Sequence, residues 1–275
     1  MFTPEEIAAF HRDGYVFSRR LFDAEEMQLM KTTAKQDRAM QAHAHDLKDR
    51  SGATAKLALW NEAGDDLYGL VARSERVARR AQQLLEDEVY HWHSKMSIKE
   101  PRVGGAWEWH QDYGYWYNNF CPWPDLVSCF IAVDPNTKEN GCMQLLKASH
   151  RMGRITHGRF GDQTGADPER VKVAMEKLEL VYAVMEPGDA LFFHCNTLHC
   201  SSQNRSEHPR WSLICCYNTR HNTPFKETDH PAYHPLHQVS DSAIKAAGAR
   251  LAADKVYWTQ ESGTTAKLTH DGIKD

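Results

Sequence analysis

A histidine and an aspartate stand two positions apart in the segment 107–112, whose sequence is WEWHQD. In an extended segment residues i and i+2 project from the same face, so His110 and Asp112 can bind one metal ion together. A second histidine would complete the facial triad of two histidines and a carboxylate that holds iron(II) and leaves open coordination positions. Candidates for this third ligand are numerous. His199 is favoured because it follows the apolar run 189–196, where a strand would deliver it to the mouth of a barrel.

The same His-x-Asp spacing occurs a second time, at His11 and Asp13. That pair lies at the end of a predicted helix, where residues two apart point about 200° away from each other. The two side chains therefore cannot chelate one ion together, and we exclude them as a metal site. The repeat also shows that the spacing alone does not identify a metal site.

Arg210 stands eleven residues after His199 and opens the next predicted strand. A dicarboxylate cosubstrate that binds the metal through its keto acid end needs a cation for its far carboxylate. A planar guanidinium pairs with a carboxylate bidentately, which lysine cannot do. Ser212 lies on the same face of that strand. Both residues are therefore predicted to bind such a cosubstrate, the alternative being that Arg210 is a surface charge.

The elements that must position these residues change character near residue 90. Before it, capping signals and helical periodicity predict helices over residues 3–13, 23–42 and 71–88. After it, alternating apolar residues between turn signals predict strands over residues 90–99, 126–134, 142–146, 178–185, 190–196 and 211–219. A weak helix is predicted near residues 240–253.

Short strands with this spacing favour a mainly β fold with flanking helices, built on a double-stranded β-helix (jelly-roll, cupin-like) core. We expect a single domain over residues 1–275, in keeping with the chain length. Its parts would be a helical N-terminal region of about residues 1–89, a jelly-roll core of about 90–219, and a C-terminal tail or lid over 220–275.

Composition narrows the possible functions. The formal charge of −4, with Lys and Arg scattered along the chain, argues against nucleic-acid binding. No segment approaches the ~18 consecutive apolar residues of a membrane span, and the first residues do not resemble a signal peptide, so a cytoplasmic protein is predicted. The seven cysteines form an odd set without CxxC spacing, which indicates reduced thiols in the core.

Five segments give the chain a resemblance to the phytanoyl-CoA dioxygenase-like family, which includes ectoine hydroxylase. They occur in the order found in that family and span nearly the whole chain. The segments are 3–6 with 10–16 (TPEE, FHRDGYV), 95–112 (KMSIKEPRVGGAWEWHQD), 139–150 (ENGCMQLLKASH), 187–189 (PGD) and 199–210 (HCSSQNRSEHPR). Where family members often have Pro-Gly-Ser-His, this chain has KASH at 147–150, which alters a turn.

The resemblance implies that His110, Asp112 and His199 bind Fe(II) and that Arg210 binds 2-oxoglutarate, with O2 as the second cosubstrate. Ser201 matches a family position that contacts the cosubstrate. Trp116 falls four residues after Asp112, where ectoine hydroxylase has a tryptophan in its site. Asp112 itself favours hydroxylation, because related halogenases lack this carboxylate.

The strand over residues 90–99 raises the question of what the substrate is. Period two places His91, His93, Lys95, Ser97 and Lys99 on one face, with Trp92, Met96 and Ile98 on the other. If the polar face looks into the barrel, Lys95 and His93 bind cosubstrate or substrate; if it looks outward, it is a solvated face. A second polar group after the last strand could close over the mouth or form an exposed loop. It consists of residues 218–222 and includes Asn218, Arg220 and His221.

Convergence of Lys95, His93, Arg220 and His221 would make a cationic pocket. We therefore expect a small polar, anionic substrate, such as an amino acid, a carboxylate or a phosphonate, to be hydroxylated with release of succinate and CO2. Few aromatic or aliphatic residues are expected to remain for a long apolar tunnel. Two alternatives stay open: a cupin-type metalloenzyme that does not use 2-oxoglutarate, and a non-catalytic jelly-roll protein that binds a metabolite. A homo-oligomer is possible in either case.

Overall fold

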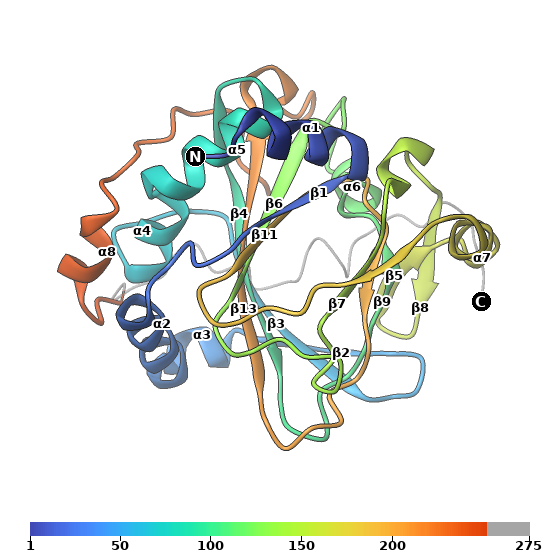
Figure 1. Cartoon of the computed structure of the whole chain (residues 1–275), viewed down its shortest axis with the longest axis horizontal. Coiled ribbons are helices and arrows are strands. Elements are labelled where there is room, and N and C mark those ends of the chain that lie inside the picture. The colour runs from blue at the N-terminus through green and yellow to red at the C-terminus, as the bar shows by residue number, and fades with distance from the viewer. Residues whose placement is uncertain (252–275) are drawn as a thin grey trace.

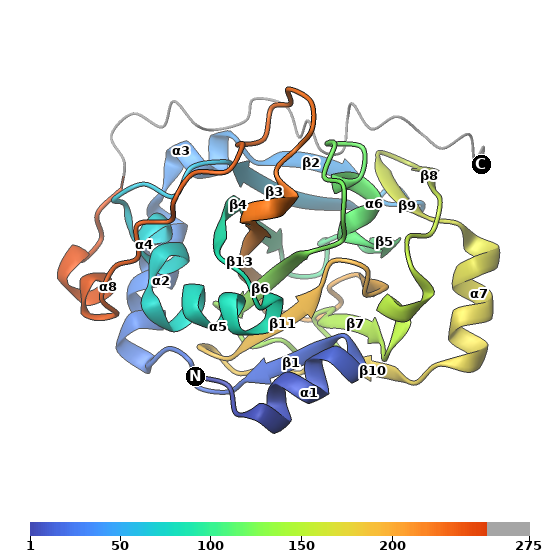
Figure 2. The same ribbon diagram turned by 90° about the horizontal axis from the view of Figure 1, so that it is seen from above.

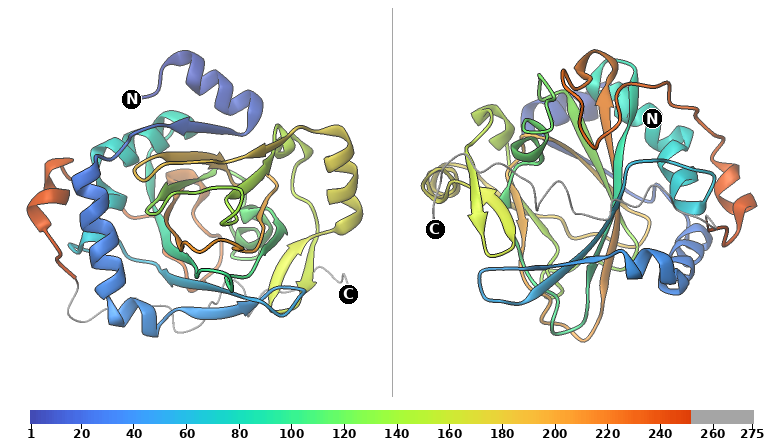
Figure 3. Two further views of the ribbon diagram at one scale, coloured as in Figure 1. Left: turned by 60° about the horizontal axis from the view of Figure 1, so that its bottom comes forward. Right: turned by 180° about the vertical axis from the view of Figure 1, so that it is seen from behind.

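Two antiparallel sheets face each other at the centre of the molecule (Figures 1 and 3), in the computed structural model, which describes residues 1–251. The larger sheet has seven strands, in the order β1 (Tyr15–Ser18), β11 (Ala190–His194), β6 (Leu126–Ala132), β13 (Arg210–Thr219), β4 (Val89–Lys99), β3 (Thr54–Trp60) and β2 (His45–Lys48). The smaller sheet has four, in the order β10 (Leu180–Tyr182), β7 (Met143–Leu146), β12 (His199–Ser201) and β5 (Trp107–His110). A hairpin of β8 (His157–Phe160) and β9 (Gln163–Ala166) lies beside β5.

The helices lie around these sheets. They are α1 (Pro4–Asp13), α2 (Ala24–Gln36), α3 (Arg38–Ala42), α4 (Leu67–Arg73), α5 (Glu75–Leu85), α6 (Asp112–Trp116), α7 (Pro168–Lys177) and α8 (Ser242–Ala247), with 3-10 turns η1 (Ser149–Met152) and η2 (Arg220–Asn222). The predicted start of α1 is confirmed, because Thr3 and Glu6 form a reciprocal capping box and Gly14 ends the helix at φ 84°. The helix predicted over 23–42 is divided at Asp37, whose side chain caps α3.

A large apolar core fills the space between the seven-stranded sheet and the helices on its outer face (Figure 2). Met96, Ile98, Leu213 and Tyr217 face it from the sheet, while α5 supplies Val77 and its neighbours. Helix α7 lies on the opposite side of the molecule, beyond the small sheet (Figures 1 and 2). Since the helices cover only the outer face of the large sheet, its inner face is left to line the space between the two sheets.

The fold confirms the predicted mainly β class with flanking helices and a jelly-roll core. All six predicted strands exist, with bounds shifted by one to three residues. The sequence did not predict β1, β2 and β3 in the N-terminal third, or the short strands β5 and β12. Among the described residues no helix is long and apolar enough to cross a membrane, and all seven cysteines are free and buried.

After β13 the chain crosses the outside of the molecule to α8 (Figure 2). Two of the contacts that hold this segment against the earlier part of the chain are the following. The Asn61 side chain donates to the carbonyl of Asp229 (2.6 Å), and Val239 forms a β-bridge with Ser74. The weak helix predicted near 240–253 is present as α8, and residues 252 and 253 lie outside the described residues.

Candidate metal centre and active site

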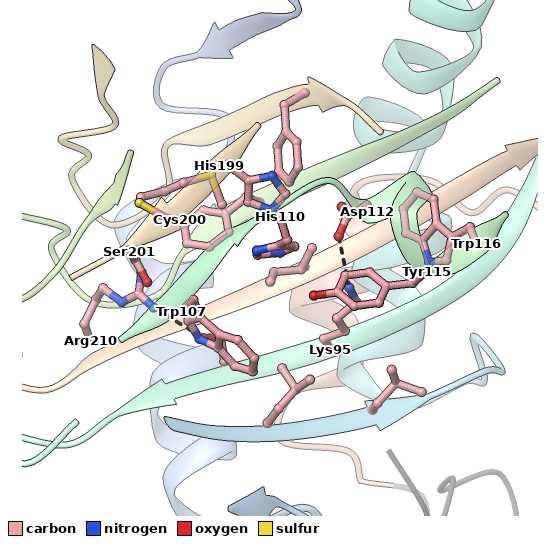
Figure 4. A pocket seen from close by; sticks show the side chains of 17 residues that line it. Lys95, Trp107, His110, Asp112, Tyr115, Trp116, His199, Cys200, Ser201 and Arg210 are labelled. Atoms are coloured by element: carbon pink, nitrogen blue, oxygen red, sulfur yellow. Dashed lines mark hydrogen bonds and ion pairs between the residues drawn. The ribbon is translucent and has the colours of Figure 1, made fainter. Parts of the chain in front are cut away.

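His110 and His199 are brought together by strand pairing. They lie directly opposite each other where β12 pairs with β5, and their ring centroids are 4.1 Å apart. Residues directly opposite in an antiparallel pair project from the same face of the sheet. Figure 4 shows both rings pointing into the space between the sheets, with Asp112 beside them. One potential ligand atom from each of the three residues lies within 4.8 Å of the other two, and all three side chains are buried.

Asp112 reaches this position from the first turn of α6 and not, as expected, from an extended strand. Gln111 still has extended backbone (φ −116°, ψ 136°), so the carboxylate stays on the same side as His110. The buried Gln111 side chain fixes the junction, because it donates to the carbonyls of Gly153 and Asn196 (2.8 Å each) and accepts from the amide of Ile155 (2.7 Å). These three hydrogen bonds fix Gln111 and so keep His110 and Asp112, on either side of it, in a constant relative position.

Both imidazoles are oriented by backbone carbonyls. Nδ1 of His110 lies 2.7 Å from the carbonyl oxygen of Glu108, and Nδ1 of His199 lies 2.9 Å from that of Thr197. A carbonyl only accepts, so each Nδ1 carries the proton and each Nε2 presents its lone pair to the centre of the site. Burial lowers the pKa of His110 well below its ordinary value and that of His199 below it as well, which keeps both rings neutral and able to bind a metal.

Asp112 is held as a carboxylate by two neighbours. Ser128 Oγ donates to Asp112 Oδ2 (2.8 Å), and Lys95 Nζ lies 3.6 Å from Asp112 Oδ1. Burial alone would raise the pKa of Asp112, but the positive charge of Lys95 lowers it below its ordinary value. Burial alone would lower the pKa of the Lys95 amine, but the negative charge of Asp112 raises it above its ordinary value. The pair is therefore charged on both sides.

We expect Ser128→Ala to weaken Fe(II) binding by roughly 10- to 100-fold, the range seen when a residue that hydrogen-bonds a metal ligand is removed. The change removes the only side-chain hydroxyl that orients Asp112 among the described residues. A fluorescence-quenching titration with Fe(II) without oxygen would measure it. Ser94→Ala is the matched control, because Ser94 is also a buried serine on a central strand but bonds His91 (2.8 Å). Equal affinities in both variants would contradict the orienting role.

The triad opens into a pocket of about 730 Å³, a volume that includes space open to solvent. Both sheets contribute to its wall (Figure 4). Besides the triad, the described lining residues are Leu57, Leu59, Lys95, Ser97, Trp107, Tyr115, Trp116, Phe130, Met143, Phe193, Cys200, Ser201, Arg210 and Ile214. Much of this wall is apolar, so the expectation of few aromatic or aliphatic lining residues was wrong. Leu57 and Leu59 come from β3, a strand that the sequence did not predict.

Arg210 is a buried cation without an acidic partner among the described residues. It is 1% exposed, its Nη2 donates to Ser97 Oγ (3.3 Å), and its Nε has no partner. Burial lowers its pKa to about 10. The hydroxyls of Ser201 and Ser212 are also buried without partners. A buried guanidinium is stable only when an anion compensates it, so these three residues fit a cosubstrate carboxylate.

Trp116 and Lys95 both line the pocket, with Lys95 Nζ 5.7 Å from the Trp116 ring centre, so of the two orientations left open for Lys95 the inward one is observed. Lys99 and Asn218, which the sequence also suggested as substrate-binding residues on the polar face of 90–99 and in the polar group 218–222, are instead structural. The Lys99 amine donates to the carbonyls of Ser201 and Ser202 and so ties β4 to the end of β12. Asn218 donates to Tyr90 Oη (2.8 Å) and to the carbonyl of Asn222 (2.9 Å), away from the pocket lining.

Arg220 and His221 do not converge on the pocket, so the predicted four-residue cationic cluster is wrong. Their side chains are 64% and 49% exposed. Arg220 pairs with Glu88 (3.4 Å), while His221 bridges Asp87 (Nδ1 to Oδ2, 2.6 Å) and Asp125 (Nε2 to Oδ2, 2.8 Å). These acidic partners are distant in the sequence and draw the η2 turn to the surface.

The His221 bridge predicts a small pH-dependent contribution to stability. Asp87 and then Asp125 raise the pKa of His221, so the bridge is fully formed below about pH 6.5, the ordinary histidine value, and is lost as the pH rises through the higher pKa of the folded protein. It also weakens at acid pH, when Asp87 gains a proton. We expect His221→Ala to lower the unfolding free energy by less than ~1 kcal/mol at pH 6 and by nothing measurable above pH 9. Denaturant unfolding at both pH values measures this, and a constant difference would contradict it.

A β-bulge in β4 changes which residues face the barrel. Cys216 of β13 pairs with His93 and the next residue, Tyr217, pairs with His91, so Trp92 is an extra residue on β4. Trp92 consequently packs with Trp116, on the barrel side, while His91 contacts the Tyr217 ring (6.5 Å) on the helix side. The expected alternation of faces therefore holds from His93 to Lys99 and fails at Trp92 and His91.

The jelly-roll core, the His-Asp-His group with exposed lone pairs and the uncompensated arginine together define a non-haem iron(II), 2-oxoglutarate-dependent oxygenase. Comparison with known proteins agrees, because the family model for phytanoyl-CoA dioxygenase (PhyH) matches residues 10–212 of this chain. The chain belongs to the phytanoyl-CoA dioxygenase family.

Several relatives and solved structures resemble the chain. Ectoine dioxygenase of Bordetella bronchiseptica is 25% identical over 261 residues, covering 89% of this chain and 84% of that protein. L-proline trans-4-hydroxylase of Streptomyces griseoviridis is 29% identical, covering 65% of this chain and 71% of that protein. The structure of EctD from S. alaskensis with bound Fe shares the fold, with a TM-score of 0.73 at 23% identity over 87% of this chain and 88% of that one.

The protein is therefore a 2-oxoglutarate-dependent hydroxylase that uses Fe(II), 2-oxoglutarate and O2. His110, Asp112 and His199 are the residues that fit the metal, and Arg210, Ser201 and Ser212 are those that fit the cosubstrate. When bound, this metal and its cosubstrates supply the oxidising chemistry. The chain itself contributes the orientation of the ligands and a largely apolar wall that limits the access of water.

Proposed function

We propose that this enzyme hydroxylates a small polar molecule that carries an acidic group, such as an amino acid, another carboxylate or a phosphonate, and releases succinate and CO2. The reaction uses iron held by His110, Asp112 and His199. Arg210, with Ser201 and Ser212, binds the far carboxylate of 2-oxoglutarate. Trp116 packs beside the reacting centre.

One observation supports the proposal that the substrate carries an acidic group. Among the described lining residues, Lys95 and Arg210 are the side chains with a permanent positive charge. Arg210 is reserved for 2-oxoglutarate, which leaves Lys95 on the Asp112 side to face the substrate. The apolar residues around it, including Leu59 and Ile214, suit the carbon skeleton of a small molecule. The relatives agree in substrate size, since one is named for ectoine and another for L-proline.

A turnover screen tests this proposal. Purified enzyme with Fe(II), 2-oxoglutarate and O2 would be incubated with small amino acids, carboxylates and phosphonates, each beside its neutral amide or ester. We expect succinate release coupled to hydroxylation with acids and much less with their neutral partners. Preferential oxidation of neutral terpenoids or acyl thioesters would overturn the substrate class while leaving the enzyme class intact.

A further inference from the structure

Four aromatic side chains, Trp116 among them, form a buried cluster on the side of the pocket away from Arg210 (Figure 4). The cluster consists of Trp92, His93, Trp116 and His230. The rings of Trp92 and His230 are stacked at 4.5 Å with an interplanar angle of 22°, His93 lies 5.2 Å from His230, and His93 lies 5.6 Å from Trp116. All four residues are 7% exposed or less.

The polar atoms of this cluster lack hydrogen-bond partners. Both ring nitrogens of His93, Nδ1 of His230 and the Nε1 atoms of Trp92 and Trp116 are buried without a partner among the described residues. Buried polar groups in folded proteins are nearly always bonded, and each exception calls for an explanation. Five such atoms on four adjoining rings indicate that the cluster is built to bond a group that the described residues 1–251 do not supply.

The positions of these residues are well determined by the fold. The β4 bulge places Trp92 and His93 together on the barrel side. His230 belongs to the segment that crosses from β13 to α8, and its neighbours hold it there: Asp229 accepts from Asn61 (2.6 Å), and Tyr233 donates to Glu88 (2.6 Å). The segment thus supplies a ring to the barrel interior as well as covering the outside.

The cluster adjoins the active site through two residues of the pocket wall. Trp116 belongs to both the cluster and the wall, and Lys95, two residues after His93 on the same strand, lines the pocket with its amine 3.6 Å from Asp112 Oδ1. A small substrate beside the metal could therefore extend a polar group toward the cluster. Two indoles cannot bind a metal, so the cluster favours an oxygen-rich group that accepts hydrogen bonds.

We propose that Trp92, His93, Trp116 and His230 form a subsite that binds the acidic group of the substrate, with His230 brought in by the segment after β13. This inference rests on the proposed function, which it deepens. The two indole N–H groups are pure donors, each neutral imidazole adds one donor, and Lys95 supplies the nearby positive charge. Burial, followed by the charge of Lys95, lowers the pKa of His93 well below its ordinary value and that of His230 to about 3, which keeps both rings neutral.

The experiment uses the full chain, loaded with Fe(II) and 2-oxoglutarate without oxygen and labelled with 15N on histidine side chains. The probes are L-proline, glycine, acetate and 2-aminoethylphosphonate, each beside a neutral amide or ester. We expect at least one acid to shift the ring nitrogen resonances of His93 and His230, and its neutral partner to leave them unchanged. If none of these acids moves the two resonances, or if the nitrogens bond water alone, the subsite is overturned.

Variants give an independent readout. His230→Phe keeps a ring stacked on Trp92 but removes both nitrogens, and we expect it to weaken binding of the shifting acid by roughly 10- to 100-fold, with 2-oxoglutarate affinity unchanged. His234→Phe is the matched control, because His234 lies on the same segment, is exposed, and packs at 6.0 Å from Tyr90. Equal acid affinity in both variants would overturn the subsite. If acids shift the ring nitrogen resonances of His93 and His230 but are not turned over, the result would count against the proposed reaction and not against the subsite.

Discussion

Replacing His199 with alanine is expected to abolish 2-oxoglutarate-dependent turnover and to weaken Fe(II) binding by more than ~100-fold. That figure is a lower bound, because it is already the upper end of the loss seen when only an outer partner of a metal ligand is removed. His199 is one of the three proposed ligands, and its lone pair is fixed toward the site by the bond from Nδ1 to the Thr197 carbonyl (2.9 Å). The two remaining ligands, His110 and Asp112, would leave the ion loosely held. An Fe(II) titration without oxygen and a succinate assay measure the two effects.

The control for this substitution is His194→Ala. His194 is another largely buried histidine, at the end of β11 in the larger sheet, where its Nδ1 accepts from the amide of Asn196 (3.0 Å). Loss of a buried imidazole as such affects both variants, whereas loss of a metal ligand affects only one. Wild-type iron affinity in the His199 variant, or an equal loss in the His194 variant, would contradict the assignment of the triad.

Residue spacing in the sequence could predict only part of the metal site. The extended backbone of Gln111 keeps Asp112 on the same side as His110 although Asp112 begins α6, so their spacing reveals them, whereas His199 depends on the register between β5 and β12. These strands contain four and three residues, too few for an alternation pattern to identify. The apolar run 189–196 favoured His199 among numerous candidates, and the ordered motifs of the family resemblance supported the same residue. Where such motifs are absent, a structure is needed to show which strand pairs with the strand that carries a metal ligand.

The error over Arg220 and His221 has a different cause. Both follow a barrel strand directly, and a run of polar residues there suggested a cover for the mouth. The acids that draw them outward are Glu88 for Arg220 and Asp87 and Asp125 for His221. All three lie over 90 residues away in the sequence, and no local pattern reports such a partner. His93 shows the opposite case. Alternation grouped it correctly with Lys95 but left open which way that face looks, and the bulge at Trp92 decides that an indole joins it in the barrel.

The apolar wall was missed for a related reason. Residues 54–60 form β3, whose inner face supplies Leu57 and Leu59 to the pocket. This strand lies within a region whose helices dominate the pattern, and its last four residues are all buried, so no clean alternation marks it. A strand buried on both faces has a continuous apolar sequence that resembles a short helix segment. The substrate consequently meets a less polar site than the sequence predicted.

Replacing Arg210 with methionine is expected to weaken 2-oxoglutarate binding by roughly 100- to 1000-fold, as for the loss of two hydrogen bonds between charged groups. The same change should leave the unfolding temperature without 2-oxoglutarate unchanged or raise it. The wild-type guanidinium is 1% exposed and has no acidic partner in the part of the chain that the structure describes, so the folded apoprotein carries the cost of burying it. Methionine has similar length, fills the same space beside Phe130 and removes that cost. Isothermal titration calorimetry and thermal unfolding, each with and without 2-oxoglutarate, measure the two effects.

Opposite signs in these two measurements separate a binding residue from a structural one. A residue that supports the fold loses stability with and without cosubstrate, whereas a residue that compensates a ligand loses only the stabilisation that the ligand supplies. Arg210→Lys is the matched control: it retains the charge but cannot pair bidentately, so we expect it to bind 2-oxoglutarate with an affinity between those of the wild type and the methionine variant. A methionine variant that binds 2-oxoglutarate as the wild type does, or that unfolds at a lower temperature without it, would contradict the proposal that Arg210 binds the far carboxylate of 2-oxoglutarate. In that case Arg210 would instead hold the sheet together through Ser97.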